Sequence, residues 1–174
     1  MARPNNGAVA DNGTFCLEDW HFGNALSGTF HVFSAQGKPI ITKELSANIL
    51  DSGISRSGRL AFCTTANSPT EDGHKLFLFD LKEGRQLFAV TPGRACERFE
   101  LDEAAQQLVA KVAGGGEYRY GADGDLVDEG AADVALLRSA DYTAVILPAE
   151  SMLKGNPDTE ELESILAALS GLVV

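Results

Sequence analysis

The three histidines are the side chains of this 174-residue chain best suited to metal or acid–base chemistry, because imidazole binds transition metals and titrates near neutral pH. They are His21, His31 and His74. His31 is predicted to lie inside one strand and His74 to begin another, so the three come from unrelated parts of the chain. A metal site needs several converging ligands. We therefore predict no bound metal ion.

The acidic segment "GADGDLVDEGAAD" is a second candidate for a metal site. Asp123 and Asp125 have the alternate spacing of a calcium-binding loop, but the segment lacks that motif's glycine at the sixth position and its closing glutamate. The chain also contains no GxSxG, Walker-type or GxGxxG motif, which position nucleophiles or phosphates. We therefore predict a solvated turn at the two aspartates, and neither catalytic residues nor a cofactor.

The cysteines, Cys16, Cys63 and Cys96, are odd in number and far apart. This spacing fits neither a disulfide framework nor a CxxC metal site, so we expect reduced thiols. The sequence also contains no apolar run long enough to cross a bilayer and no signal-like segment at its start. A cytoplasmic protein without membrane contact is the expectation.

An aromatic cluster in "LEDWHFGN" is the candidate for partner binding. It comprises Trp20, His21 and Phe22, whereas the corresponding segment of the next repeat, "NSPTEDG", is polar. Aromatic residues in a loop are typical of recognition surfaces. The alternative is a plug that packs over a neighbouring sheet, since large aromatic side chains are more often buried than displayed.

The segment "GHKLFLFDLKEGRQLFAVTPG", residues 73 to 93, predicts the elements that must position these residues. Leu76 and Leu78 fall on one face of its first strand, and Phe77 and Phe79 on the other, with a turn that closes on glycine. Both faces are apolar. Such a hairpin is typical of a sheet that is covered on both faces, as in a stack of sheets, rather than of a sheet with one face exposed to solvent.

This hairpin recurs in "GTFHVFSAQGKPIITKEL" and in "GEYRYGADGDLVDE", where Phe33 and Tyr120 occupy the position of Phe79. Another strand pair precedes each hairpin. The turns of the first two of these pairs align at Asn12-Gly13 and Ser57-Gly58, while the third has "EAAQQ" without a glycine. Each unit therefore holds four short strands in a meander, with a period of about 40 to 48 residues.

With "SGRLAFCTT" and "KLFLFDLKEGRQLFAV", the chain resembles the β-propeller repeats of the WD-repeat and quinoprotein type over roughly residues 7 to 129. It lacks the Trp-Asp dipeptide, and Trp20 is its one tryptophan. The resemblance implies blade-shaped sheets and no particular ligand. Three blades are fewer than the four to eight that close a ring, so the sequence predicts an incomplete propeller or a part of a longer one.

The segment after Gly130 changes from strand to helix periodicity. Residues 131 to 153 predict one or two short helices, divided or kinked at Pro148. A further helix is predicted after Asn156 as N-cap, with Pro157 at its first position. Its apolar stripe is expected to dock on the blades or on a second copy of the chain, through Leu162, Ile165, Leu166 and Leu169.

The fold class that follows is mainly β with a C-terminal α segment: three four-stranded antiparallel blades in residues 1–130 and a helical cap or oligomerisation segment in residues 131–174. The net charge is −11, with nine acidic and eight basic residues before position 94 and sixteen and six from there on. Acidic surfaces repel phosphate, which disfavours nucleic-acid binding. We expect a non-enzymatic module that binds a protein partner; the alternative is a small-ligand or enzymatic site at the blade centre, completed by a second subunit.

Overall fold

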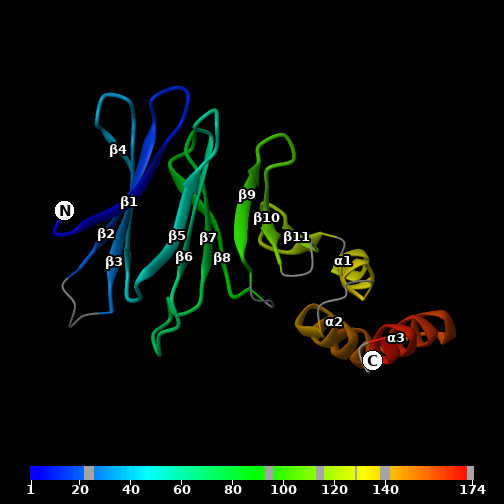
Figure 1. The fold of residues 1–174 in the computed structure, drawn as a ribbon. Helices are drawn as coiled ribbons and strands as arrows, with labels where there is room; N and C mark the ends of the chain where they lie inside the picture. The colour runs from blue at the N-terminus through cyan, green and yellow to red at the C-terminus, as the bar shows by residue number, and fades with distance from the viewer. Residues whose placement is uncertain (22–25, 93–95, 113–115, 128, 138–141, 172–174) are drawn as a thin grey trace. The chain divides into compact units, whose positions relative to one another are not determined.

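The computed structural model describes residues 1–21, 26–92, 96–112, 116–127, 129–137 and 142–171 (Figure 1). The chain groups into two compact units. The first comprises Met1–Pro92, Leu101–Gln107 and Ala122–Gly124, and the second comprises Gly93–Glu100, Leu108–Gly121 and Asp125–Val174. The division at residue 130 that the sequence suggested stays a prediction.

Two four-stranded antiparallel sheets form most of the first unit, each a simple meander in chain order. The strands of the first sheet are β1 (Pro4–Val9), β2 (Phe15–Trp20), β3 (Gly28–Phe33) and β4 (Pro39–Leu45). Those of the second are β5 (Ile49–Ile54), β6 (Leu60–Thr65), β7 (Leu76–Asp80) and β8 (Arg85–Val90). Every residue of β6 is buried, as expected for a strand that is covered on both faces.

The core of the first unit lies between these two sheets. Phe30 of β3 contacts Phe79 of β7, with 5.4 Å between the ring centroids, and the Lys43 ammonium lies 5.4 Å from the ring centre of Phe77. The buried apolar side chains of this core are Cys16, Phe30, Val32, Ile41, Leu45, Ile49, Ala61, Cys63, Phe77, Phe79 and Leu81. Burial of this apolar surface holds the two sheets together.

The first turn of each blade passes through a residue with positive φ. Gly13 (φ 80°) and Gly58 (φ 76°) supply it in the first two blades, where glycine adopts this conformation without a steric penalty. Gln106 (φ 53°) supplies it in the third. The segment without a glycine therefore still turns in the same way, at the conformational cost of a non-glycine residue there.

The third sheet has the same meander topology and consists of β9 (Arg98–Asp102), β10 (Gln107–Lys111), β11 (Glu117–Tyr120) and β12 (Leu126–Val127). It is shorter than the other two, with only two residues in its last strand. The three sheets and the helices that follow confirm the predicted fold class. None of the three closes into a barrel within the described chain.

Helix α1 (Glu129–Leu136) packs on the third sheet. The Tyr118 hydroxyl donates a 2.5 Å hydrogen bond to Oδ1 of Asp133, and both side chains are buried. A Cβ at Gly116 would lie 2.3 Å from the Leu136 side chain, so any other residue there would force Leu136 to move. Strand β11 and helix α1 are thus joined by the hydrogen bond between Tyr118 and Asp133, next to the apolar contact of Leu136.

The last two helices, α2 (Tyr142–Lys154) and α3 (Thr159–Gly171), form a second small core. The structure has two short helices in the region where one or two were predicted. Pro148 lies inside α2 and does not divide it, so the division falls before α2 and not at the proline, and a kink at Pro148 stays a prediction. The predicted N-cap is also wrong, because Asp158 caps α3. The Asp158 carboxylate accepts a hydrogen bond from the backbone N–H of Glu161, and the Glu161 carboxylate accepts one from the backbone N–H of Asp158. Each bond is 2.9 Å long, and the reciprocal pair is a capping box.

The apolar stripe of α3 is only partly covered in the described chain. Ile165 is 1% exposed and Leu169 is partly buried, and both pack in the core with α2. Leu162 and Leu166 are 39% and 62% exposed. Docking of these two side chains therefore stays a prediction. No described helix is long and apolar enough to span a membrane.

Candidate functional site

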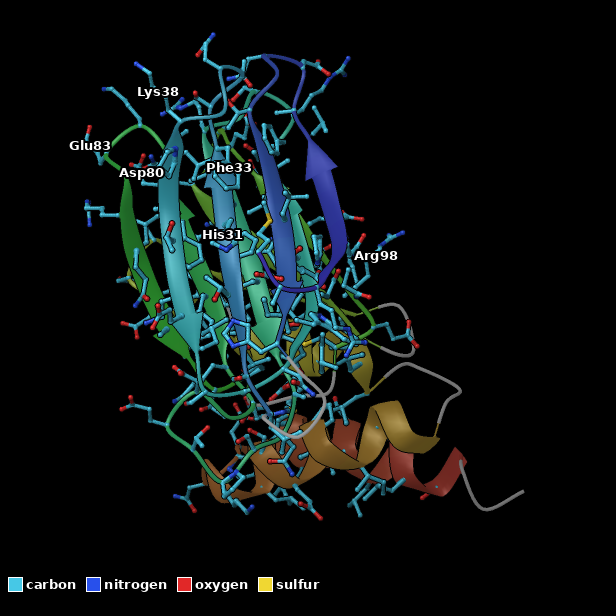
Figure 2. The ribbon with its side chains drawn as sticks, turned by 90° about the vertical axis from the view of Figure 1, so that its left-hand side faces the viewer. His31, Phe33, Lys38, Asp80, Glu83 and Arg98 are labelled. Carbon is cyan, nitrogen blue, oxygen red and sulfur yellow. The ribbon has the colours of Figure 1, made fainter. Side chains whose placement is uncertain are left out.

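The face of the first sheet that points away from the second sheet carries an apolar surface, which Figure 2 views with His31 and Phe33 labelled along β3. Directly paired residues share a face of a sheet, and the register pairs Phe15 with Phe33 and Leu17 with His31. Val9 pairs with Phe15 from the edge strand β1. We call the apolar part of this face the outer face; it consists of Val9, Phe15, Leu17, His31 and Phe33. The same face also carries polar residues, because the exposed Thr42 pairs with His31 and the exposed Glu44 pairs with Thr29.

The aromatic rings of the outer face stack on one another. The ring centroids of Phe15 and Phe33 are 5.2 Å apart and those of His31 and Phe33 are 5.6 Å apart. The two phenylalanines and His31 are half-buried, whereas Val9 is 75% exposed. Burial lowers the pKa of His31, although the Asp19 carboxylate opposes this effect. The neutral imidazole is therefore favoured near neutral pH, which suits a surface of low polarity.

The opposite face of the first sheet holds a buried carboxylate at its contact with the second sheet. Glu18 is 1% exposed, and its Oε1 accepts a 2.8 Å hydrogen bond from Oγ of Ser52. Nε1 of Trp20 donates to the other carboxylate oxygen at 3.3 Å, and Nδ2 of Asn6 donates to Oε1 at 3.5 Å. This cluster could not be predicted from the sequence, because a glutamate usually faces solvent.

The predicted partner-binding residues lie at the end of β2. Trp20 is half-buried and its indole is held by Glu18. His21 contacts two hydroxyls, with 3.0 Å from Nδ1 to Oγ of Ser27 and 3.0 Å from Nε2 to Oγ1 of Thr29. Phe22 lies outside the described residues. The structure thus fixes the orientation of Trp20 and His21, and their role in partner binding stays a prediction.

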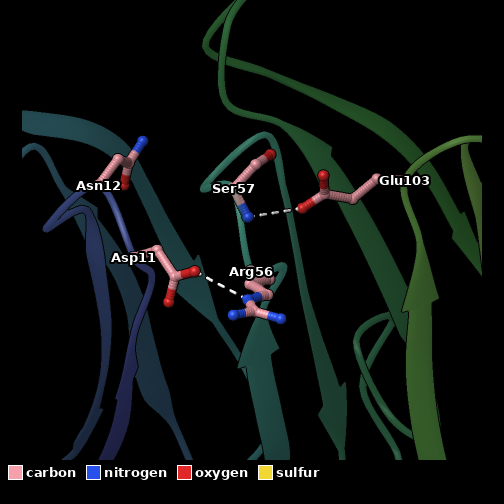
Figure 3. A pocket seen from close by; sticks show the side chains of 5 residues that line it. All are labelled: Asp11, Asn12, Arg56, Ser57 and Glu103. Atoms are coloured by element: carbon pink, nitrogen blue, oxygen red, sulfur yellow. Dashed lines mark hydrogen bonds and ion pairs between the residues drawn. The ribbon is translucent and has the colours of Figure 1, made fainter.

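A polar pocket of about 520 Å³ lies among the turns of the first unit (Figure 3). Nε of Arg56 donates to Oδ2 of Asp11 at 2.8 Å, and the backbone N–H of Ser57 donates to Oε1 of Glu103 at 2.8 Å. Hydrogen bonds from Ser55 and Ser57 lower the pKa of Glu103. The charged groups of the pocket therefore already bind groups of the protein itself, which favours a structural role for them.

The histidines and acidic residues of the described chain form no group of three or more ligands that could hold a metal ion. Cys16 and Cys63 are buried, and burial raises the pKa of both thiols. A thiol with a raised pKa is a weak nucleophile at neutral pH. The outer face is therefore the best candidate for a functional surface within the described residues.

One face of the third sheet is charged, in contrast to the apolar outer face of the first sheet. Nη2 of Arg98 pairs with Glu100 at 2.7 Å, and Nζ of Lys111 lies 3.7 Å from Glu100. Lys111 and Arg119 both form ion pairs with Glu117. These five charged residues form a continuous ladder across β9, β10 and β11. Such a face is stable in water and costly to cover with apolar groups.

No protein-family model matches this chain, and no curated protein does. Among solved structures, HIRA(644-1017) matches with a TM-score of 0.53 at 14% identity, over 98% of this chain and 56% of that one. The β-propeller domain of Cps50 (Swd1) from Myceliophteria thermophila has a TM-score of 0.47 at 16% identity, over 68% of this chain and 34% of that one. The corresponding values for the β-propeller domain of the Trilobed protease from Pyrococcus furiosus are 0.49, 12%, 74% and 42%.

These comparisons bear on the fold alone, since all identities are low. The three meanders of this chain are β-propeller-type blades, as the sequence predicted. The chain spans 34% to 56% of the length of the matched structures. Three blades are fewer than the four to eight that close a ring, so the described blades form an incomplete propeller.

Proposed function

We propose that this protein is a non-enzymatic protein-interaction module built on an incomplete propeller. The observation that carries the proposal is the outer face of the first sheet, where aromatic and aliphatic side chains remain partly open to solvent. Apolar surface of this kind on a monomer marks a site of interaction. The polar pocket is a weaker candidate for partner binding, because its charged groups are already bonded within the protein. Arg56 binds Asp11, and Glu103 binds the backbone N–H of Ser57.

The binding partner is inferred to be a protein rather than nucleic acid. The chain carries a net charge of −11, which opposes contact with phosphate backbones. We also propose that Trp20, His21 and Phe22 contribute to partner binding at the end of β2. A reducing compartment such as the cytoplasm suits the three cysteines, none of which forms a disulfide.

An affinity pull-down of the tagged full-length chain from its native lysate, followed by mass spectrometry, tests this function. The test variant is Val9→Asp, because it places a charge on the outer face at a side chain that is 75% exposed. We expect a defined set of proteins that the wild type enriches and the variant does not. Equal recovery by both would show that the outer face is not the binding surface, and the absence of any enriched protein would contradict an interaction module.

A further inference from the structure

We infer that the charged ladder of the third sheet excludes contact with another blade, and so prevents the outer face of a second copy of this chain from docking on it head to tail. The charged ladder consists of Arg98, Glu100, Lys111, Glu117 and Arg119. This surface has no part in the proposed function, so the inference holds whether or not the outer face binds a protein. It rests on the internal repeat, which allows the same positions to be compared in three blades.

The strand register shows which positions of the three blades correspond. Phe33 and Phe79 each follow a shift in the pairing of the second hairpin. Tyr120 precedes a turn that is closed in the same way as the turn after Phe33, so all three aromatic residues occupy one position of the repeat. Successive residues of a strand point to opposite faces of the sheet. The position just before the aromatic residue therefore lies on the other face, and it holds Val32, Leu78 and Arg119 in the three blades.

This other face is buried and apolar in the first two blades. Val32 and Leu78 are 0% exposed, and so are Phe30 and Leu76, which lie two positions earlier on the same strands. Phe30 and Val32 belong to the core between the first two sheets. The first blade therefore docks on the second through this face.

The third blade carries charges at both of these positions. Glu117 and Arg119 occupy them, and their side chains are 36% and 38% exposed. Glu117 also forms an ion pair with Lys111, its register partner on β10. Hydrogen bonds from Lys111 and Arg119 lower the pKa of Glu117, so the carboxylate is ionised at neutral pH. The face through which the first blade docks is thus, in the third blade, a network of paired charges open to solvent.

The outer face of the first sheet is of the type that receives a docking face. Phe33 corresponds to Phe79, and its register partner Phe15 corresponds to Ala61. Phe79 and Ala61 lie in the core where the second sheet receives the first. By the same geometry, the third sheet of one copy would be placed on the first sheet of another. Such a contact uses a different surface on each copy, so it does not close and would continue into a chain of copies.

The charged ladder opposes this association. Covering it with Val9, Phe15 and Phe33 would strip water from its charged groups, and the outer face has no charged partner to offer them in return. The apolar rings would also gain less than they gain against an apolar face such as that of Phe30 and Val32. An apolar outer face and a charged ladder can therefore be present on one chain without head-to-tail association.

Light scattering on the purified full chain, over a range of concentrations, tests this inference. The double variant Glu117→Phe/Arg119→Val gives the third blade the residues of the first blade at these positions, and the net charge stays at −11 because one acid and one base are removed. Lys111 keeps its contact with Glu100. We expect the mass of the variant to rise with concentration to at least about twice that of the wild type. Adding Val9→Asp should return the mass to the wild-type value.

Lys82→Val/Glu83→Phe is the matched control. It places the same two side chains at another ion pair, in the turn between β7 and β8, where both charged side chains are exposed. The mass of this control should equal that of the wild type. An unchanged mass of the ladder variant, equal growth in the control, or growth that Val9→Asp does not reverse would overturn the inference.

Photo-cross-linking gives a second measurement that leaves the charged ladder intact, so it does not depend on the folding of the double variant. The photoreactive amino acid p-benzoylphenylalanine replaces Val9, which is 75% exposed, in the otherwise unchanged chain. We expect no adduct between position 9 and β9, β10 or β11 of a second copy, whereas the double variant should yield one. Such an adduct with the intact ladder would overturn the inference. Neither measurement uses a partner protein, so their results leave the pull-down to decide the proposed function separately.

Discussion

Ser52 donates a 2.8 Å hydrogen bond from its hydroxyl to the buried carboxylate of Glu18, across the contact between the first two blades. Glu18 is 1% exposed, so its carboxyl group depends on hydrogen-bond donors from the protein. Ser52→Ala removes one of them. We expect the free energy of unfolding to fall by about 1 to 3 kcal/mol, since the buried carboxyl group then loses one of its three side-chain donors and keeps only Trp20 and Asn6.

Chemical denaturation of Ser52→Ala measures this effect, and the exposed Thr42→Ala in β4 serves as the control. The control should change the free energy of unfolding by less than about 0.5 kcal/mol. A double-mutant cycle with Glu18→Gln should reveal a coupling of about 0.5 kcal/mol or more between the two side chains. Independent effects of the two substitutions would show that the hydrogen bond does not contribute to the blade contact.

Trp20 offers a test of the predicted recognition residues. It is half-buried and donates one hydrogen bond to Glu18, so Trp20→Ala should lower the free energy of unfolding by only about 1 to 2 kcal/mol. Partner capture in the pull-down should be lost. A cost of about 3 to 5 kcal/mol with capture retained would instead identify Trp20 as a core plug. Urea denaturation and the pull-down on the same preparation decide between the two.

The two faces of α3 should respond differently to truncation. Ile165→Ala opens a cavity against α2 and should destabilise the helical unit by about 2 to 5 kcal/mol. Leu166→Ala, at the adjacent and exposed position, is the matched control and should have little effect on a monomer. Thermal melts measure both, and light scattering gives the mass. A strong effect of Leu166→Ala together with the mass of a dimer would place α3 in a contact between two copies.

The carboxylate of Glu103 should make stability depend on acid pH. Hydrogen bonds from Ser55 and Ser57 lower its folded-state pKa below the ordinary value of 4.5. The unfolded chain then binds the proton more readily, so this contribution to stability is fully present above pH 4.5 and disappears as the pH falls through the folded-state pKa. Glu103→Gln should flatten this part of the curve of unfolding free energy against pH. An unchanged curve would show that the contact with Ser57 does not persist in solution.

The thiols should be slow to react in the folded protein. Burial raises the pKa of Cys63 well above its ordinary value and that of Cys96 to about 11, so little thiolate exists at neutral pH. Titration of the denatured protein without reductant should recover all three thiols. Recovery of only one would reveal a disulfide and contradict the reducing compartment. Rapid modification of the native protein at pH 7 would contradict the burial of these cysteines.

The three blades follow from local patterns in the sequence. Alternating residues such as Leu76 and Phe77 direct side chains to both faces of a strand, and glycines such as Gly37 and Gly84 close the turns. These are local properties of the chain, which is why a repeat could be aligned without a structure. The same alignment placed Phe33, Phe79 and Tyr120 at one position, where the register also has them.

Which of these equivalent faces is covered depends on contacts between segments that are distant in sequence. Phe79 and Phe33 have the same local pattern, yet one packs in the core and the other lies on the outer face, because only the second sheet has a neighbouring blade on that side within the first unit. The burial of Glu18 and the exposure of Leu166 also depend on which distant segment lies opposite. Periodicity shows that a side chain belongs to a face, but the burial of that face depends on packing between elements distant in sequence.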